Sequence, residues 1–224
     1  MRLAVTATAA LVGLMLYEAP SALAKQPTVV DVPNGPAFVK LPGKQEVSAR
    51  SGQDLVNNTV LRTSKPGRMQ IKLGTGRQFR MGGNALLQLK NSTVKLQRGA
   101  LIGWIQPGLK NRQPFKIQTR LATASIQGTT VFIELDDDKL KVFSWEGDVK
   151  VVTTSGESYT LQSGEQLLVE LNQPTITWSA PVKIKEAEAS RRLTKSRLIN
   201  GFATPMDTLQ EIERELGVKA LDRS

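Results

Sequence analysis

Apolar and polar residues alternate with a period of two over most of the chain between about residues 47 and 178. The alternation is clearest in five segments: 68–73, 87–90, 94–97, 115–121 and 166–171. Successive side chains of a β-strand point to opposite faces, so this pattern is typical of strands buried on one face. The sequence therefore predicts that residues 47–180 form a β domain.

Short turn sequences interrupt these segments at close intervals. Examples are Lys65-Pro66-Gly67 and the aspartate run at 136–138. Many short strands separated by such turns indicate an all-β fold of sandwich or solenoid type. No long helical pattern interrupts the strands, so a parallel βαβ architecture is not expected.

The two ends of the chain show different patterns. Residues 25–46 contain four prolines and little periodicity, which predicts an extended arm. Residues 181–224 are predicted to form a helical tail of two short helices. The first helix covers 185–199, and the second begins at Thr204-Pro205, with Thr204 as N-cap, and ends near Gly217.

The first 24 residues have the features of a secretory signal peptide. Arg2 precedes an apolar stretch at 3–16, and Ala22-Leu23-Ala24 matches the small-x-small cleavage pattern. Cleavage after Ala24 would make Lys25 the new N-terminus, and retention of the segment as an anchor is the alternative. The stretch is shorter than the roughly 17–25 residues that span a bilayer, and no later segment is apolar enough. We therefore expect a periplasmic or secreted protein without a transmembrane span after cleavage.

Composition narrows the possible chemistry. The chain has no cysteine and no histidine, which excludes disulfides, thiolate catalysis and zinc sites built from Cys and His. We expect no cofactor and no metal. Glu134 and the aspartates at 136–138 are the one candidate acid group, and an Asp-rich tripeptide between strands is ordinarily a turn. A non-catalytic protein is therefore predicted. A carbohydrate-active enzyme, which would need two carboxylates in a cleft, is one alternative.

The net charge of +10 is concentrated in the first half of the chain. Residues 40–120 hold 16 of the Lys and Arg residues and only two acids. Six cations there occupy the polar phase of predicted strands and form the candidate anion-binding face: Lys72, Arg80, Lys90, Lys95, Lys116 and Arg120. Such a face would attract polysaccharide, lipid headgroups or an acidic protein. A solvated sheet face is the alternative, and nucleic acid is not expected as the partner of an exported protein.

A chain of short motifs in residues 50–171 resembles the FecR domain, the periplasmic sensory module of iron-citrate type regulators. The motifs occur at 61–63, 69–73, 76–89, 94–101, 115–119, 126–129, 142–151 and 161–165. Their shared positions are the glycines and the threonine of strand-turn-strand steps: Gly99, Gly128, Thr129, Gly147 and Gly164. Val131 departs from the pattern, because the family often has Phe after Gly-Thr.

The resemblance implies a FecR-like β domain with a role in binding or sensing. Regulators of this family carry a sigma-factor-binding segment and a membrane helix ahead of the domain, where this sequence has the predicted signal peptide and arm. The leading hypothesis is therefore an exported adaptor that binds an anionic envelope partner. A sensory regulator coupled to a receptor or membrane partner is the alternative. Neither the partner's identity nor the oligomeric state follows from the sequence.

Overall fold

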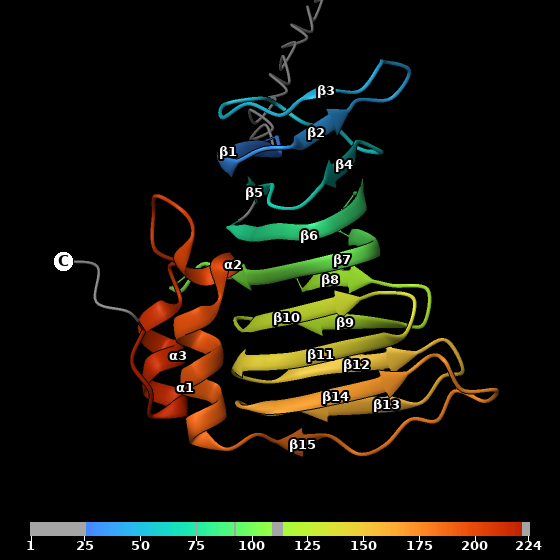
Figure 1. Cartoon of the computed structure of the whole chain (residues 1–224), viewed down its shortest axis with the longest axis vertical. Helices are drawn as coiled ribbons and strands as arrows, with labels where there is room; N and C mark the ends of the chain where they lie inside the picture. Colours follow the sequence, from blue (N-terminus) through green and yellow to red (C-terminus); the bar gives the residue numbers. More distant parts are fainter. Residues whose placement is uncertain (1–25, 75, 92, 109–113, 221–224) are drawn as a thin grey trace, which may run out of the picture.

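The computed structural model describes residues 26–74, 76–91, 93–108 and 114–220. The predicted signal peptide and its cleavage point between Ala24 and Lys25 lie outside these ranges. The described residues form fifteen strands of one continuous, unclosed sheet and three short helices (Figure 1). The prediction of an all-β fold with a helical C-terminal tail is confirmed, but the tail has three short helices instead of the predicted two, because the predicted helix at 185–199 is divided at Ser196.

A long hairpin organises the sheet. It consists of β6 (Arg77–Lys90) and β7 (Thr93–Ile105), and both strands bend where the register shifts between Gly82 and Leu86. Before the bend, β6 pairs with β5 (Arg68–Lys72), and after it with β4 (Val60–Thr63). The hairpin thus turns one sheet into two layers that pack face to face.

The first layer is called the helix-side layer. It contains residues 77–82 of β6, residues 99–105 of β7, and the strands β1 (Thr28–Asn34), β5, β10 (Thr130–Leu135), β11 (Lys139–Glu146), β14 (Glu165–Glu170) and β15 (Val182–Lys183).

The second layer is called the open layer. It contains residues 86–90 of β6, residues 93–96 of β7, and the strands β2 (Ala37–Lys40), β3 (Val47–Ser48), β4, β8 (Phe115–Gln118), β9 (Ala122–Ile126), β12 (Val149–Thr153) and β13 (Ser158–Leu161). The pairing of β7 with β8 is parallel, and every other strand pair is antiparallel among the described residues.

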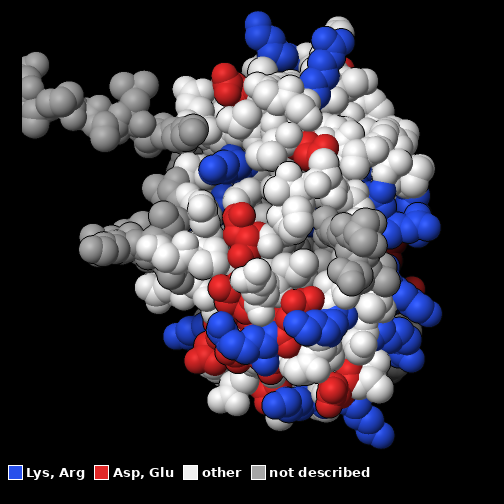
Figure 2. All heavy atoms as spheres, turned by 90° about the vertical axis from the view of Figure 1, so that its left-hand side faces the viewer, with Lys and Arg blue, Asp and Glu red and all other residues white. Residues whose placement is uncertain are grey.

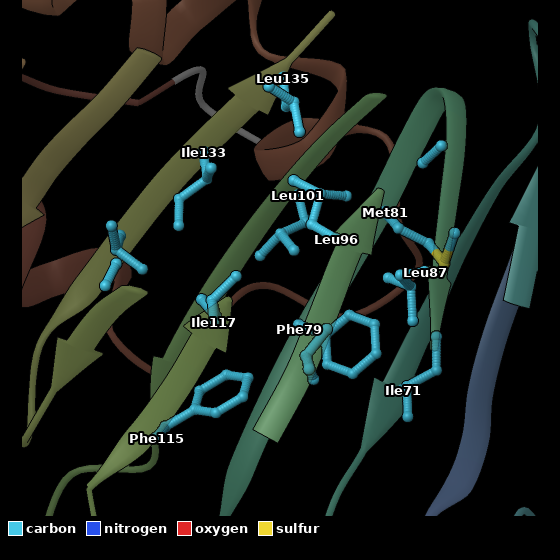
Figure 3. Close-up of a cluster of buried hydrophobic side chains, with 14 of the residues drawn as sticks. Ile71, Phe79, Met81, Leu87, Leu96, Leu101, Phe115, Ile117, Ile133 and Leu135 are labelled. Carbon is cyan, nitrogen blue, oxygen red and sulfur yellow. The ribbon is translucent and has the colours of Figure 1, made fainter. Parts of the chain in front are cut away.

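The main hydrophobic core lies between the two layers. Figure 3 shows side chains from both layers pointing toward one another, among them Ile71 and Phe79 from the helix-side layer and Leu87 and Ile117 from the open layer. All four are fully buried. They occupy the apolar phase of the alternation, so the period-two pattern identified the inward face of each strand correctly.

A second core lies under the helical tail. The tail contains α1 (Glu186–Lys195), α2 (Arg197–Asn200) and α3 (Leu209–Leu216), which stand at one end of the stacked strands in Figure 1. Leu193 and Ile212 of the tail pack with Trp104, Phe143 and Trp145, which face outward from the helix-side layer. No helix within the described ranges combines the length and hydropathy needed to cross a membrane.

Two predictions about the ends differ from the structure. Residues 28–34 and 37–40 are paired strands of the sheet, so this part of the proline-rich segment is not a free arm. The last helix begins at Leu209, with Thr208 rather than Thr204 at the N-cap position. The Thr204 carbonyl and the Asp207 carboxylate are instead hydrogen-bonded to Arg80 and Gln78 of β6, which holds this stretch against the sheet.

Candidate functional site

The outer face of the open layer carries a regular row of polar side chains. The register places six residues side by side across β6, β7, β8, β9, β12 and β13: Lys90, Thr93, Lys116, Ser125, Lys150 and Thr160. We call this set the lysine row. Because neighbouring strands lie about 4.8 Å apart, its lysines recur roughly every 10 Å.

The strands hold the lysine row outward because the alternate positions are buried. Val94, Ile117 and Ala124 flank its members along the strands and belong to the core between the layers. The three lysines are exposed. A one-residue register slip would bury them, so the core fixes which face they occupy.

A second register row runs beside the first and includes Lys95. Its members are Lys40, Val60, Gln88, Lys95, Gln118, Thr123, Val152 and Ser158. Neither row contains an acid. A hollow of about 510 Å³ is lined by Ser125, Lys150 and Thr160, and also by the acid Asp148. The face therefore offers cations, hydroxyls and amides over several strands.

One further cation of this face is already neutralised. Arg62 of β4 donates from Nε to Glu46 Oε2 at 3.1 Å and lies over the ring of Phe38. The hydrogen bond with Arg62 lowers the pKa of the Glu46 carboxyl below its usual value. Arg62 is therefore less available to a ligand than the lysines.

The six predicted site residues do not form one surface. Lys90, Lys95 and Lys116 share the open-layer face. Lys72 is half-buried on the helix-side layer, and Arg120 is exposed in the β8–β9 turn, where it donates to the Asp136 carbonyl at 3.1 Å.

Arg80 differs most from the predicted exposed face, because the tail buries its side chain completely. Its guanidinium donates to Gln70 Oε1 at 2.8 Å and to the carbonyls of Leu198, Ile199 and Thr204 at 3.1, 2.8 and 2.5 Å. The prediction that Arg80 belongs to an exposed charged face is wrong. Its outward phase was correct, but the helical tail covers that part of the helix-side layer.

Lys150 was missed, although the sequence contains a signal for it. It lies between Val149 and Val151, so the alternation places it outward. It falls in the acidic part of the chain, however, and only the pairing order β12-β9-β8-β7 brings it into line with Lys116.

The surface over the tail differs from the lysine row. Figure 2, which looks onto the helices, shows Lys and Arg intermixed with Asp and Glu over its lower half. Ion pairs such as Arg192–Glu188 account for part of this mixture. An extended anion would meet repulsion there as well as attraction.

The candidate acids are occupied in local structure. Asp136 Oδ1 accepts from the backbone N–H groups of Asp138 and Lys139, at 3.0 and 2.8 Å, which closes the β10–β11 turn. Glu134 stands opposite Lys141 in the same pair of strands. The arrangement is that of a hairpin turn rather than of two carboxylates facing across a groove.

Part of the chain matches a known protein family. Residues 59–150 match the family model described as FecR protein. Over these residues the chain is similar to the FecR family. The match spans β4 to β12 and supports a FecR-like regulatory or sensory protein.

Two crystal structures of a putative anti-sigma factor from Parabacteroides distasonis resemble the chain. One, at 2.50 Å resolution, is 15% identical with a TM-score of 0.49 and covers 70% of this chain and 73% of its own. The other, at 1.65 Å, is 16% identical with a TM-score of 0.45 and covers 67% and 71%. A search of curated protein sequences found no significant match.

The glycines shared with the FecR family occupy close contacts within the domain. A Cβ on Gly99, which lies at the bend of β7 with a φ of +86°, would stand 2.3 Å from Ala85 Cα. A Cβ on Gly147 would stand 2.4 Å from Thr129 Cγ2, so the Gly128-Thr129 step and Gly147 belong to one contact. Gly164 packs against Leu216 of α3. These positions maintain the fold of the FecR domain, and the lysine row lies elsewhere on it.

Proposed function

We propose that this protein is a non-catalytic binding protein of the cell envelope, periplasmic or secreted, that holds an extended anionic partner against the lysine row. The observation that carries the proposal is the register itself, which aligns Lys90, Lys116 and Lys150 on alternate strands. Hydroxyl groups of Thr93, Ser125 and Thr160 fill the positions next to the lysines. A polymer of repeating negative charge would meet a cation roughly every 10 Å along the row.

Exposure and charge support an extended partner rather than a small one. The lysines are exposed, no acid occupies either register row, and the face is broad instead of enclosed. A flat cationic face gains little from a single charge in water, because exposed ion pairs contribute only about 0–1 kcal/mol each. Several such ion pairs, formed at the same time along a polymer or a membrane surface, would together give a measurable affinity.

Replacing Lys90, Lys116 and Lys150 by Gln is expected to weaken binding to immobilised dextran sulfate at least tenfold at low salt. Each Lys near an anionic surface contributes on the order of 1 kcal/mol, and 1.4 kcal/mol corresponds to about tenfold in affinity. Surface plasmon resonance at several salt concentrations measures the change. Binding of the unmodified protein should fall as salt rises.

The matched control removes three exposed lysines near the helical tail: Lys183, Lys185 and Lys219. Its net charge equals that of the row variant, so a purely global charge effect would weaken both variants equally. That result, or salt-independent retention of the unmodified protein, would contradict the proposal.

The FecR match favours a sensory regulator as the second candidate. In that case the N-terminal segment stays in the membrane and the domain contacts a receptor. Mass spectrometry of the protein recovered from envelope fractions separates the two. A mature chain beginning at Lys25 supports the exported binding protein, and an intact Met1 terminus in the membrane fraction supports the regulator.

A further inference from the structure

A cavity lies at the junction between the helical tail and the bend of β6. Its volume is about 320 Å³, within the range of small-ligand sites. Three cations line it, Lys65, Arg68 and Arg197, together with apolar groups that include Phe132 and Leu198. It opens on the helix-side layer, and therefore not on the face that carries the lysine row.

Arg68 is held in place by small neighbours. A Cβ on Gly201 would lie 3.1 Å from Arg68 Cζ, and a Cβ on Gly82 would lie 3.0 Å from its Cγ. Arg68 Nη2 donates to Asn34 Oδ1, whereas Arg68 Nε is buried and has no hydrogen-bond partner within the described structure. Arg68 is thus half-buried in the cavity wall, and one donor of its guanidinium group is unpaired inside the protein, which is unfavourable.

The charges around the cavity are not compensated. Burial and then the charge of Arg197 lower the pKa of Arg68 below its usual value. In the part of the chain that the structure describes, no carboxylate forms a salt bridge with Lys65, Arg68 or Arg197. Like charges at one partly buried place are unfavourable and become favourable when an anion binds between them.

A second cavity of about 230 Å³ adjoins the first, since both are lined by Phe132 and Ser196. Its walls combine the rings of Phe143 and Trp145 with three cations, Lys141, Arg192 and Lys195. Trp145 Nε1 is also buried without a hydrogen-bond partner among the described residues. Both cavities are thus lined by cations, and Phe132 contributes an apolar surface to each.

We propose that the first cavity binds a small organic anion, with a carboxylate or phosphate head at Arg68 and Arg197 and an apolar body lying over Phe132. The guanidinium groups match the planar or tetrahedral oxygens of such a head. The apolar groups Phe132 and Leu198 of the same cavity favour a ligand with an apolar body over a free inorganic ion. This site is independent of the lysine row, and neither proposal requires the other.

Isothermal titration of the unmodified chain with phenyl phosphate, benzoate and inorganic phosphate tests the site. Phenyl phosphate is expected to bind saturably and at least tenfold more tightly than inorganic phosphate. Comparison with benzoate shows whether the head is a phosphate or a carboxylate. Absence of saturable binding by all three probes at millimolar concentration would overturn the proposal.

Arg197→Gln is expected to weaken phenyl phosphate binding at least tenfold, because it removes a cation from the head position. Arg197 is exposed, so the variant should keep its fold. The matched control is Arg191→Gln, at an exposed position of α1. Phe132→Ala should reduce the preference for phenyl phosphate over inorganic phosphate. Equal binding by the Arg197 and Arg191 variants would overturn the assignment.

Discussion

Replacing Arg80 by methionine is expected to lower the free energy of unfolding by about 3 kcal/mol or more. The side chain donates to three backbone carbonyls of the tail, and leaving a buried acceptor unsatisfied costs about 1–3 kcal/mol. Its guanidinium also lies 4.3 Å from the centre of the Phe202 ring, a contact that methionine replaces only in part. Domains are stable by about 5–15 kcal/mol, so the loss is a large fraction.

Urea unfolding followed by circular dichroism measures this loss, and hydrogen exchange over residues 186–216 shows where it occurs. In Arg80→Met, exchange should accelerate more in the tail than in the sheet, because the variant loses the hydrogen bonds that join α2 and the following loop to β6. Arg80→Lys keeps a charge but cannot reach the same set of acceptors, so an intermediate loss is expected. Lys95→Met is the control, since Lys95 is exposed. Equal unfolding midpoints for Arg80→Met and Lys95→Met would contradict the structural role.

Gly99→Ala is expected to destabilise the domain by about 3 kcal/mol or more, or to prevent folding. A left-handed backbone costs a non-glycine residue about 1–3 kcal/mol. The new Cβ would additionally meet Ala85 Cα at 2.3 Å and Ala85 N at 2.6 Å, and both are backbone atoms that cannot move aside without opening the bend. Thermal unfolding of the purified variant, or its yield in the soluble fraction, measures the effect.

Gly156→Ala separates the two contributions. Gly156 has a φ of +94°, but nothing lies within 4 Å of the position of its Cβ. This variant should show the backbone cost alone and unfold at a higher temperature than Gly99→Ala. If the two variants were equally destabilised, the close approach of β7 to Ala85 would contribute nothing.

The alternation in the sequence predicted the strands well because burial on one face determines it directly. Residues such as Met69 and Ile71 are inward in the structure, as the period of two requires. The bend was not predicted, although the inward residues of β7 change phase there, from Val94 and Leu96 to Leu101 and Ile105. The parallel pairing of β7 with β8 was also hidden, since pairing order depends on contacts between distant segments.

The candidate site was predicted only in part for the same reason. The phase of Lys90, Lys95 and Lys116 follows from their neighbours along each strand. Whether an outward residue reaches solvent depends on what covers that layer, and the sequence did not show that the tail packs over Arg80. The start of α3 was placed early because Thr204-Pro205 resembles a helix start, whereas contacts with β6 engage that segment instead.

The contacts of Arg80 have a consequence for the order of folding. Among the described strand pairs, the largest separation along the sequence is that between Thr28 and Lys72. The hydrogen bond from Arg80 to the Thr204 carbonyl spans 124 positions. Closing a longer loop costs more conformational entropy, so we expect the strands to pair before the tail docks on Arg80. Contacts made after the transition state affect unfolding rates more than folding rates. We therefore expect substitution of Arg80 to raise the unfolding rate more than it lowers the folding rate.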